Sequence, residues 1–153
     1  MDLLYGEGYS IGKSLFIIQR YFKIFLNHKV KKYGLNGAQS LVLHALMKED
    51  GLSQEEINEG LQFDKGFLAK VAKSLEKEGY IIRKVNQEDR RAYKLFLTHK
   101  GKGLKPIILE ILNEWDSTIL EGVTEEKIDI FENILNGMLK GIAIKCKEVK
   151  EGK

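Results

Sequence analysis

The stretch from Asp64 to Thr98 constrains the fold of this chain more than any other part of the sequence. Its first half carries apolar residues at i, i+3, i+4 and i+7, the spacing that gathers side chains on one face of a helix: Leu68, Val71, Ala72 and Leu75. Asp64 is a good N-cap, because its carboxylate can accept hydrogen bonds from the free amides of the first turn. Gly79 suits the left-handed residue that ends a helix. We therefore predict a helix between Asp64 and Gly79 with one buried face.

A β-hairpin is predicted to follow this helix. The run Tyr80–Val85 is rich in β-formers, residues 86–91 form a polar turn, and the run Ala92–Leu97 returns with its side chains alternating between two faces. The outward side of the preceding helix keeps three lysines, Lys65, Lys70 and Lys73. A helix with a basic outer face, followed by a hairpin with a basic tip, is typical of a winged helix. We interpret this stretch as a DNA-binding unit.

The charge distribution agrees with this interpretation. From Phe63 to Lys105 the chain has 12 Lys and Arg against 5 Asp and Glu, a balance of +7. The remaining residues hold 13 basic and 17 acidic side chains, a balance of −4, so the net charge of the whole chain is only +3. Positive charge thus gathers on the helix and hairpin, where DNA phosphates would lie. The alternative is a solvated surface on which basic residues cluster by chance.

Two further helices are predicted just before this unit. Asn36 can cap a helix over residues 37–48, with Leu41, Val42, Ala45 and Leu46 pointing inward. The segment Ser53–Glu56 is a capping box, and it starts a short helix that reaches about Gly60. A three-residue turn joins this short helix to the one that begins after Asp64. The two helices therefore form a helix-turn-helix whose second helix has the basic face.

Strongly apolar helices flank the unit on both sides. One is predicted from Lys13 to Tyr33. Another follows the cap residue Thr98 and is kinked or delayed by Pro106. The last begins at Thr124, and its charged tail is expected to fray from Lys145. A helix that is apolar over most of its circumference needs cover on more than one side, so we expect a second subunit to supply that cover.

These observations predict one fold class: mainly α with a small β-hairpin wing, a winged helix-turn-helix flanked by dimerisation helices. A chain of 153 residues is long enough for a single domain with a real core. We place the winged helix at about 35–98 and the dimerisation helices at about 8–33 and 99–146, within one domain over 1–153. Two-fold pairing would set two recognition helices one DNA turn apart, about 34 Å.

Residues 89–101 carry the most specific motif in the chain, which consists of Asp89-Arg90-Arg91 and then Leu95, Leu97-Thr98 and Lys100-Gly101. This motif resembles the wing signature of the MarR family of winged-helix transcription regulators. The resemblance extends over nearly the whole chain, through Leu75–Ile81, Trp115 and the region 120–126. It implies a homodimer that binds palindromic operators, usually as a repressor. In many members a small phenolic or anionic ligand releases the DNA.

The wing motif suggests particular DNA contacts. Arg91 would enter the minor groove, and Asp89 would brace the turn or pair with an arginine. The alternative is that Arg90 and Arg91 are solvated charges on a loop.

On the recognition helix, Lys65, Lys70 and Lys73 would face the major groove or its phosphates, unless they simply form a solvated face. Gly66 would let backbone amides approach a phosphate at the helix N-terminus. Phe67 and Ala69 could contact a thymine methyl group, or pack against the protein. At positions 66, 67, 69 and 70 many family members have hydroxyl residues and an arginine. Lysine cannot make the two-pronged guanine contact of arginine, so the operator sequence cannot be deduced from these residues.

Of the features predicted from the sequence, a ligand site has the fewest residues to indicate it. In this architecture a cleft would open between the first, second and fifth helices. Lys13 and Arg20 lie seven residues apart on one helical face and could meet an anion there, with His44 bordering the cavity. The alternative is that these side chains are polar tips on an otherwise buried helix.

The sequence argues against several other classes of protein. It has no catalytic constellation, so we do not expect an enzyme or a cofactor. The three histidines lack metal-ligand spacing, and a single cysteine, Cys146, excludes an intrachain disulfide. Peroxide-sensing members of the MarR family carry their reactive cysteine near the N-terminus, where this chain has none, so we do not expect redox sensing. No secretory signal or membrane span is recognisable, so a cytoplasmic location is expected. The alternative function is a winged-helix protein-interaction module whose basic face does not bind specific DNA.

Overall fold

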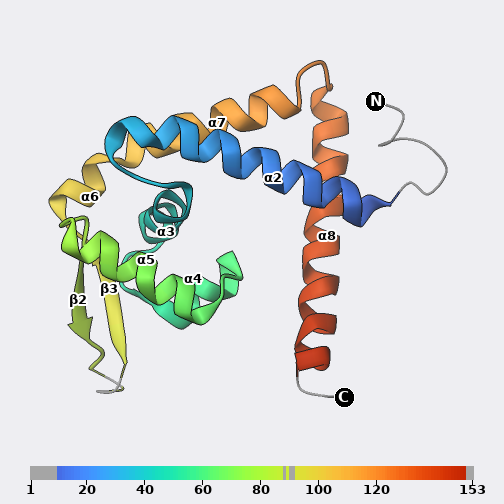
Figure 1. Cartoon of the computed structure of the whole chain (residues 1–153). Coiled ribbons are helices and arrows are strands. Elements are labelled where there is room, and N and C mark those ends of the chain that lie inside the picture. The colour runs from blue at the N-terminus through green and yellow to red at the C-terminus, as the bar shows by residue number, and fades with distance from the viewer. Residues whose placement is uncertain (1–9, 88, 90–91, 151–153) are drawn as a thin grey trace. The chain divides into compact units, whose positions relative to one another are not determined.

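The computed structural model describes residues 10–87, 89 and 92–150, with side chains as far as Cys146 (Figure 1). The chain divides into two compact units, Met1–Trp115 and Asp116–Lys153. The elements of the first unit are α2 (Ile11–Val30), η1 (Lys31–Tyr33), α3 (Gly37–Lys48), β1 (Leu52–Ser53), α4 (Gln54–Leu61), α5 (Lys65–Lys77), β2 (Ile81–Val85), β3 (Tyr93–Leu97), α6 (His99–Gly103) and most of α7 (Lys105–Ile119). The second unit contains the end of α7 and α8 (Glu125–Lys150). This confirms the predicted class, mainly helical with a small β wing.

Helix α3 occupies the centre of the first unit (Figure 1). It packs against α2, α4, α5 and β3, and Val42, Leu43 and Leu46 are fully buried. Asn36 caps it as predicted, and a reciprocal bond from the Asn36 amide to Gln39 Oε1 completes a capping box, each contact being 2.9 Å. The sequence pattern missed Leu43, because a helix surrounded by other elements buries more than one face.

The sheet has three strands, although only the two strands of the hairpin were predicted. Its order is β1-β3-β2 and both pairings are antiparallel. Leu95 of β3 lies opposite Leu52 on one side and Arg83 on the other. The strand β1 is only two residues long, too short to show an alternating pattern, and it exists because β3 offers it an edge.

The predicted capping box at the start of α4 is confirmed. The Glu56 amide donates to Ser53 Oγ at 3.2 Å, and the Ser53 amide donates to Glu56 Oε2 at 2.7 Å. Hydrogen bonds that Ser53 donates to the Glu56 carboxylate, first of all the one from its backbone amide, stabilise the charged form and lower the pKa of Glu56. The short helix is therefore fixed at its first turn, and it sets the position from which the turn at residues 62–64 leads into α5.

The helices after the wing differ slightly from the prediction. Thr98 caps α6, accepting a hydrogen bond from the Gly101 amide at 3.1 Å. Pro106 lies in the first turn of α7, where its missing N–H leaves no helical bond unmade, so the predicted late start is confirmed. The expected fraying from Lys145 is wrong: α8 continues to Lys150, since residues 145–150 include no glycine or proline that would end it.

Helix α2 and the part of α7 before Trp115 lie side by side (Figure 1). The rings of Phe22 and Phe25 pack against Trp115 with centroid separations of 5.1 and 5.3 Å, and Lys29 pairs with Glu114. Among the described residues, no helix is long and apolar enough to cross a membrane.

Candidate nucleic-acid interface

Helix α5 begins at a firmly made cap. Asp64 Oδ1 accepts from the amides of Gly66 and Phe67 at 2.9 and 3.2 Å. The predicted apolar face, Leu68, Val71, Ala72 and Leu75, is buried in the core. The cap and the buried face together hold the opposite face of α5 outward in one orientation.

The outward face of α5 is basic, as predicted. Lys65, Lys70 and Lys73 are all exposed, and so is the small side chain of Ala69 between them. Phe67 is 47% exposed, and its ring meets the ring of Phe63 edge to face, with centroids 5.3 Å apart. Phe67 therefore packs against the protein and also keeps apolar surface exposed, and its contact with a thymine methyl group stays a prediction.

The wing follows directly and is tied to α5. Arg83 Nε on β2 lies 3.0 Å from Glu76 Oε2 on α5, an ion pair whose geometry is not that of a hydrogen bond. Towards the tip, the Asn86 amide donates to the carbonyl of Ala92, and the Ala92 amide donates to the carbonyl of Asp89, both at 2.9 Å. Asp89 is exposed. The predicted contact residues Arg90 and Arg91 lie outside the described residues.

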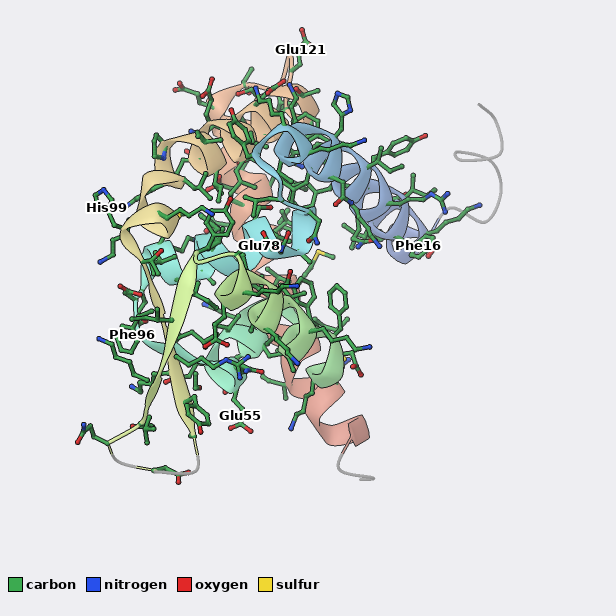
Figure 2. The ribbon with its side chains drawn as sticks, turned by 60° about the vertical axis from the view of Figure 1, so that its left-hand side comes forward. Phe16, Glu55, Glu78, Phe96, His99 and Glu121 are labelled. Atoms are coloured by element: carbon green, nitrogen blue, oxygen red, sulfur yellow. The ribbon has the colours of Figure 1, made fainter. Side chains whose placement is uncertain are left out.

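Two further lysines stand on the strands of the wing. Lys84 and Lys94 occupy directly opposite positions on β2 and β3, and Lys84 Nζ lies 4.8 Å from the centroid of the Phe96 ring (Figure 2). No sequence pattern assigns these two lysines a common role, because only the strand register places them opposite each other.

Comparison with known proteins identifies the family. A model of the MarR family matches residues 33–92. The crystal structure of a MarR transcriptional regulator from Methanosarcina mazei is 35% identical, with a TM-score of 0.82 over 88% of this chain and 97% of that one. The regulator SarZ of Staphylococcus epidermidis is 30% identical over 72% of this chain and 74% of its own length.

This chain belongs to the MarR family. A MarR-family regulator from Listeria monocytogenes, whose structure was determined in complex with a 26-mer DNA, is 28% identical and has a TM-score of 0.89 over 94% of this chain and 96% of that one. The relatives are named as transcriptional regulators, so this MarR-family chain is a transcription regulator and not an enzyme.

The start of the recognition helix bears on the role expected for Gly66, which is to let backbone amides approach a DNA phosphate. In this structure the amides of Gly66 and Phe67 bond to the Asp64 carboxylate. A phosphate would have to displace that carboxylate against its negative charge. The backbone amide of Gly66 therefore serves the cap in this structure, and its approach to a phosphate stays a prediction.

The three residues expected to border a ligand site lie on two helices of the MarR-family fold. Lys13 and Arg20 are exposed on α2, and His44 is partly buried on α3. Burial lowers the pKa of His44, and the nearby charge of Lys48 lowers it further. His44 thus favours its neutral form at neutral pH, and the ligand site itself remains a prediction.

A partly buried polar cluster, which no sequence pattern predicts, joins α3 to the end of α5 in this MarR-family chain. The amide of Gln39, on α3, donates to Ser74 Oγ at 3.1 Å and to Glu78 Oε1 at 3.2 Å, both at the end of α5 (Figure 2). The positions are 35 and 39 residues apart in sequence. No local pattern could reveal this contact, since only the packing of α3 on α5 creates it.

Among the described residues, no group of three metal-ligand side chains comes together.

Proposed function

We propose that this MarR-family chain is a homodimeric repressor that binds a palindromic operator and is released by a small-molecule effector. The observation that carries the proposal is the exposed lysine face of α5, held outward by the Asp64 cap and the buried face of the helix. Next to it stands a wing bearing Lys84 and Lys94. Cations presented on a rigid helix fit the phosphates and base edges of a major groove.

The proposal assigns separate roles to the contact residues. Lys65 and Lys73 contact phosphates, while Lys70, Phe67 and Ala69 lie nearest the bases, the last two against apolar groups such as a thymine methyl. At the wing, Arg91 enters the minor groove, Arg90 is a second DNA-binding cation at the tip, and Asp89 braces the turn or pairs with an arginine. The Listeria regulator has the same fold and its structure was determined with DNA, which supports a DNA-binding role for this chain.

Exposed apolar side chains support the homodimer. On α2 the exposed set includes Ile11, Leu15, Phe16, Ile18, Tyr21 and Ile24, and on α8 it includes Ile130, Ile134, Leu139, Ile142 and Ile144. A monomer in water rarely exposes so many large apolar side chains along a single helix, as α2 and α8 each do. Pairing of two copies removes that surface from water and places two recognition helices for two half-sites.

Salt-dependent binding tests the DNA-binding role. We would select bound duplexes from a random pool and measure the affinity of the best sequence and of a scrambled copy against salt concentration. For a DNA regulator, the logarithm of the binding affinity should fall linearly with the logarithm of the salt concentration, with a slope near −0.9 for each phosphate neutralised. The operator should bind much more tightly than its scrambled copy. A flat salt response would instead indicate a protein-interaction module.

The effector requires a separate test. Lys13 and Arg20 are exposed cations on one helix, and a carboxylate could bridge them near His44. A ligand shifts the equilibrium between the DNA-binding and non-binding forms of the dimer only as far as it binds the form with the non-binding spacing of the recognition helices more tightly. Salicylate and related aromatic carboxylates would be titrated into the operator complex, with Arg20→Ala as the matched variant. Release that is weakened in Arg20→Ala supports the site, and no release by any of these anions rejects it.

A further inference from the structure

The C-terminal end of α5 is attached to α3 through one buried side chain, Gln39. Only 4% of Gln39 is exposed, and its amide nitrogen donates to Ser74 Oγ and Glu78 Oε1. Ser74 Oγ in turn donates to Glu78 Oε1 at 2.8 Å, so the three side chains close a ring of hydrogen bonds. The Glu78 carbonyl also accepts from Lys100 Nζ at 2.7 Å, which adds a contact from α6.

The same end of α3 is attached to α2. The Gly37 amide donates to Asn27 Oδ1 on α2 at 2.7 Å, and a Cβ at Gly37 would lie 3.3–3.4 Å from Asn27 and Leu26. Gln39 itself accepts from the Asn36 amide through its oxygen while it donates to α5 through its nitrogen. A continuous polar path therefore runs from α2, through the first turn of α3, to the last turn of α5.

We infer that Gln39 is a positioning residue that sets the angle at which α5 presents its lysines, and this inference rests on the proposed DNA-binding function. Lys65 lies nine residues before Ser74, about 13 Å along the helix axis at 1.5 Å per residue. Rotation of α5 by about 5° around its attached end moves Lys65 by about 1 Å, and a contact site needs its side chains held within about 0.5 Å. Gln39 touches no DNA and acts through Ser74 and Glu78.

The variant Gln39→Glu tests this role. A carboxylate at N3 still completes the capping box with Asn36, so the start of α3 is preserved. It cannot donate to Glu78, however, and two carboxylates then face each other. We expect operator affinity to fall about tenfold, on the scale of one lost hydrogen bond to a charged group. Affinity for the scrambled duplex and its salt slope should change little, because the exposed lysines remain.

The exchange of both residues is the rescue. In Gln39→Glu combined with Glu78→Gln, the amide and the carboxylate trade places, so the ring of hydrogen bonds can form again. Discrimination between operator and scrambled duplex should return to within about threefold of the parent chain. If Gln39 and Glu78 served only stability, these variants would change the melting temperature but would not lose and regain discrimination between operator and scrambled duplex.

Ser40→Ala is the matched control. Ser40 is also buried on α3, but its hydroxyl donates to the Gly37 carbonyl of its own helix and does not reach α5. The Ser40→Ala variant should discriminate between operator and scrambled duplex as well as the parent chain does. If Gln39→Glu does not fold, Ser74→Ala removes the central hydroxyl and leaves the cap of α3 intact. The inference is overturned if the folded variants discriminate like the parent, or if the exchange fails to restore discrimination. A parent chain that binds no DNA would refute the proposed function itself.

Discussion

At the scale of single residues, the proposed DNA interface is expected to depend on side chains that do not belong to the core. Lys70 and Lys73 stand on a helix whose opposite face is buried, and Arg91 belongs to the wing motif. Removal of such side chains should cost contacts with DNA and leave the fold intact. Partly buried residues, such as His44, should affect stability first.

Arg91→Ala should weaken binding to operator and scrambled duplex alike. The minor groove distinguishes little beyond A·T from G·C, so Arg91 contributes affinity more than sequence choice. The salt slope should fall by about one unit. Lys70→Ala is the contrasting variant, and it should reduce the difference in affinity between operator and scrambled duplex if Lys70 contacts a base. Unchanged binding of Arg91→Ala at every salt concentration, with an unchanged melting curve, would contradict the minor-groove assignment.

His44 should make the fold less stable at acidic pH. Its folded-state pKa lies below the ordinary value near 6.5, because burial and Lys48 disfavour the charged form. The unfolded chain then binds a proton that the folded chain does not, so stability falls as the pH drops through about 6.5 towards the lower folded-state value. Denaturant melts at pH 7.5 and pH 5.5 should differ less in His44→Gln than in the parent. An equal difference in both proteins would remove His44 as a cause.

At the scale of elements, close backbone approaches decide how the wing is attached to the helices. The Thr98 hydroxyl, which caps α6, donates to the carbonyl of Gly79 at 2.7 Å, so one side chain serves both the start of α6 and the end of the α5 turn. Gly101 on α6 leaves room for the Tyr80 carbonyl, which lies just before β2. The wing is therefore held at its base by α6.

Gly101→Ala should destabilise the fold. The added Cβ would lie 2.2 Å from the Tyr80 carbonyl oxygen, a backbone atom that cannot turn aside. The expected cost is about 1–3 kcal/mol, typical of overpacking, and thermal melting measures it. Gly103→Ala is the control on the same helix, since nothing lies within 4 Å of its added Cβ, and it should be neutral or slightly stabilising. Equal melting temperatures for the two variants would show that α6 is not packed tightly against Tyr80.

At the scale of the whole molecule, the main expectation is two-fold assembly. The exposed apolar side chains of α2 and α8 exceed what a monomer keeps in water, and two recognition helices need a common frame to read two half-sites.

Sedimentation of the parent chain at micromolar concentration should give a mass near twice 17.5 kDa. Leu139→Glu places a charge in the exposed apolar set of α8 and should shift the mass towards the monomer without loss of helix. Lys140→Glu, at the next and exposed position, is the control and should remain dimeric. A clean monomer for the parent chain would reject the dimer and the two-half-site mechanism together.

Local features of this protein are readable from its sequence. The caps at Asn36, Ser53, Asp64 and Thr98 follow from short side chains placed before apolar helical patterns, and the structure confirms each of them. The outward lysines of α5 follow from the same periodicity. These features depend on residues within a few positions of one another, so a linear pattern contains them.

Features that depend on distant segments were decided only by the tertiary structure. The strand β1 exists because β3 lies beside it, and Leu43 is buried because α3 is surrounded. Gln39 reads as an ordinary polar residue near a helix start, yet it bonds to α5 across 35 positions of the chain. A hydrogen bond of this kind needs two helices to pack first, and their packing is set by the whole core. The sequence by itself determined which residues of α5 face outward, because helical periodicity is local, and the tertiary structure decided which distant side chains α5 packs and bonds against.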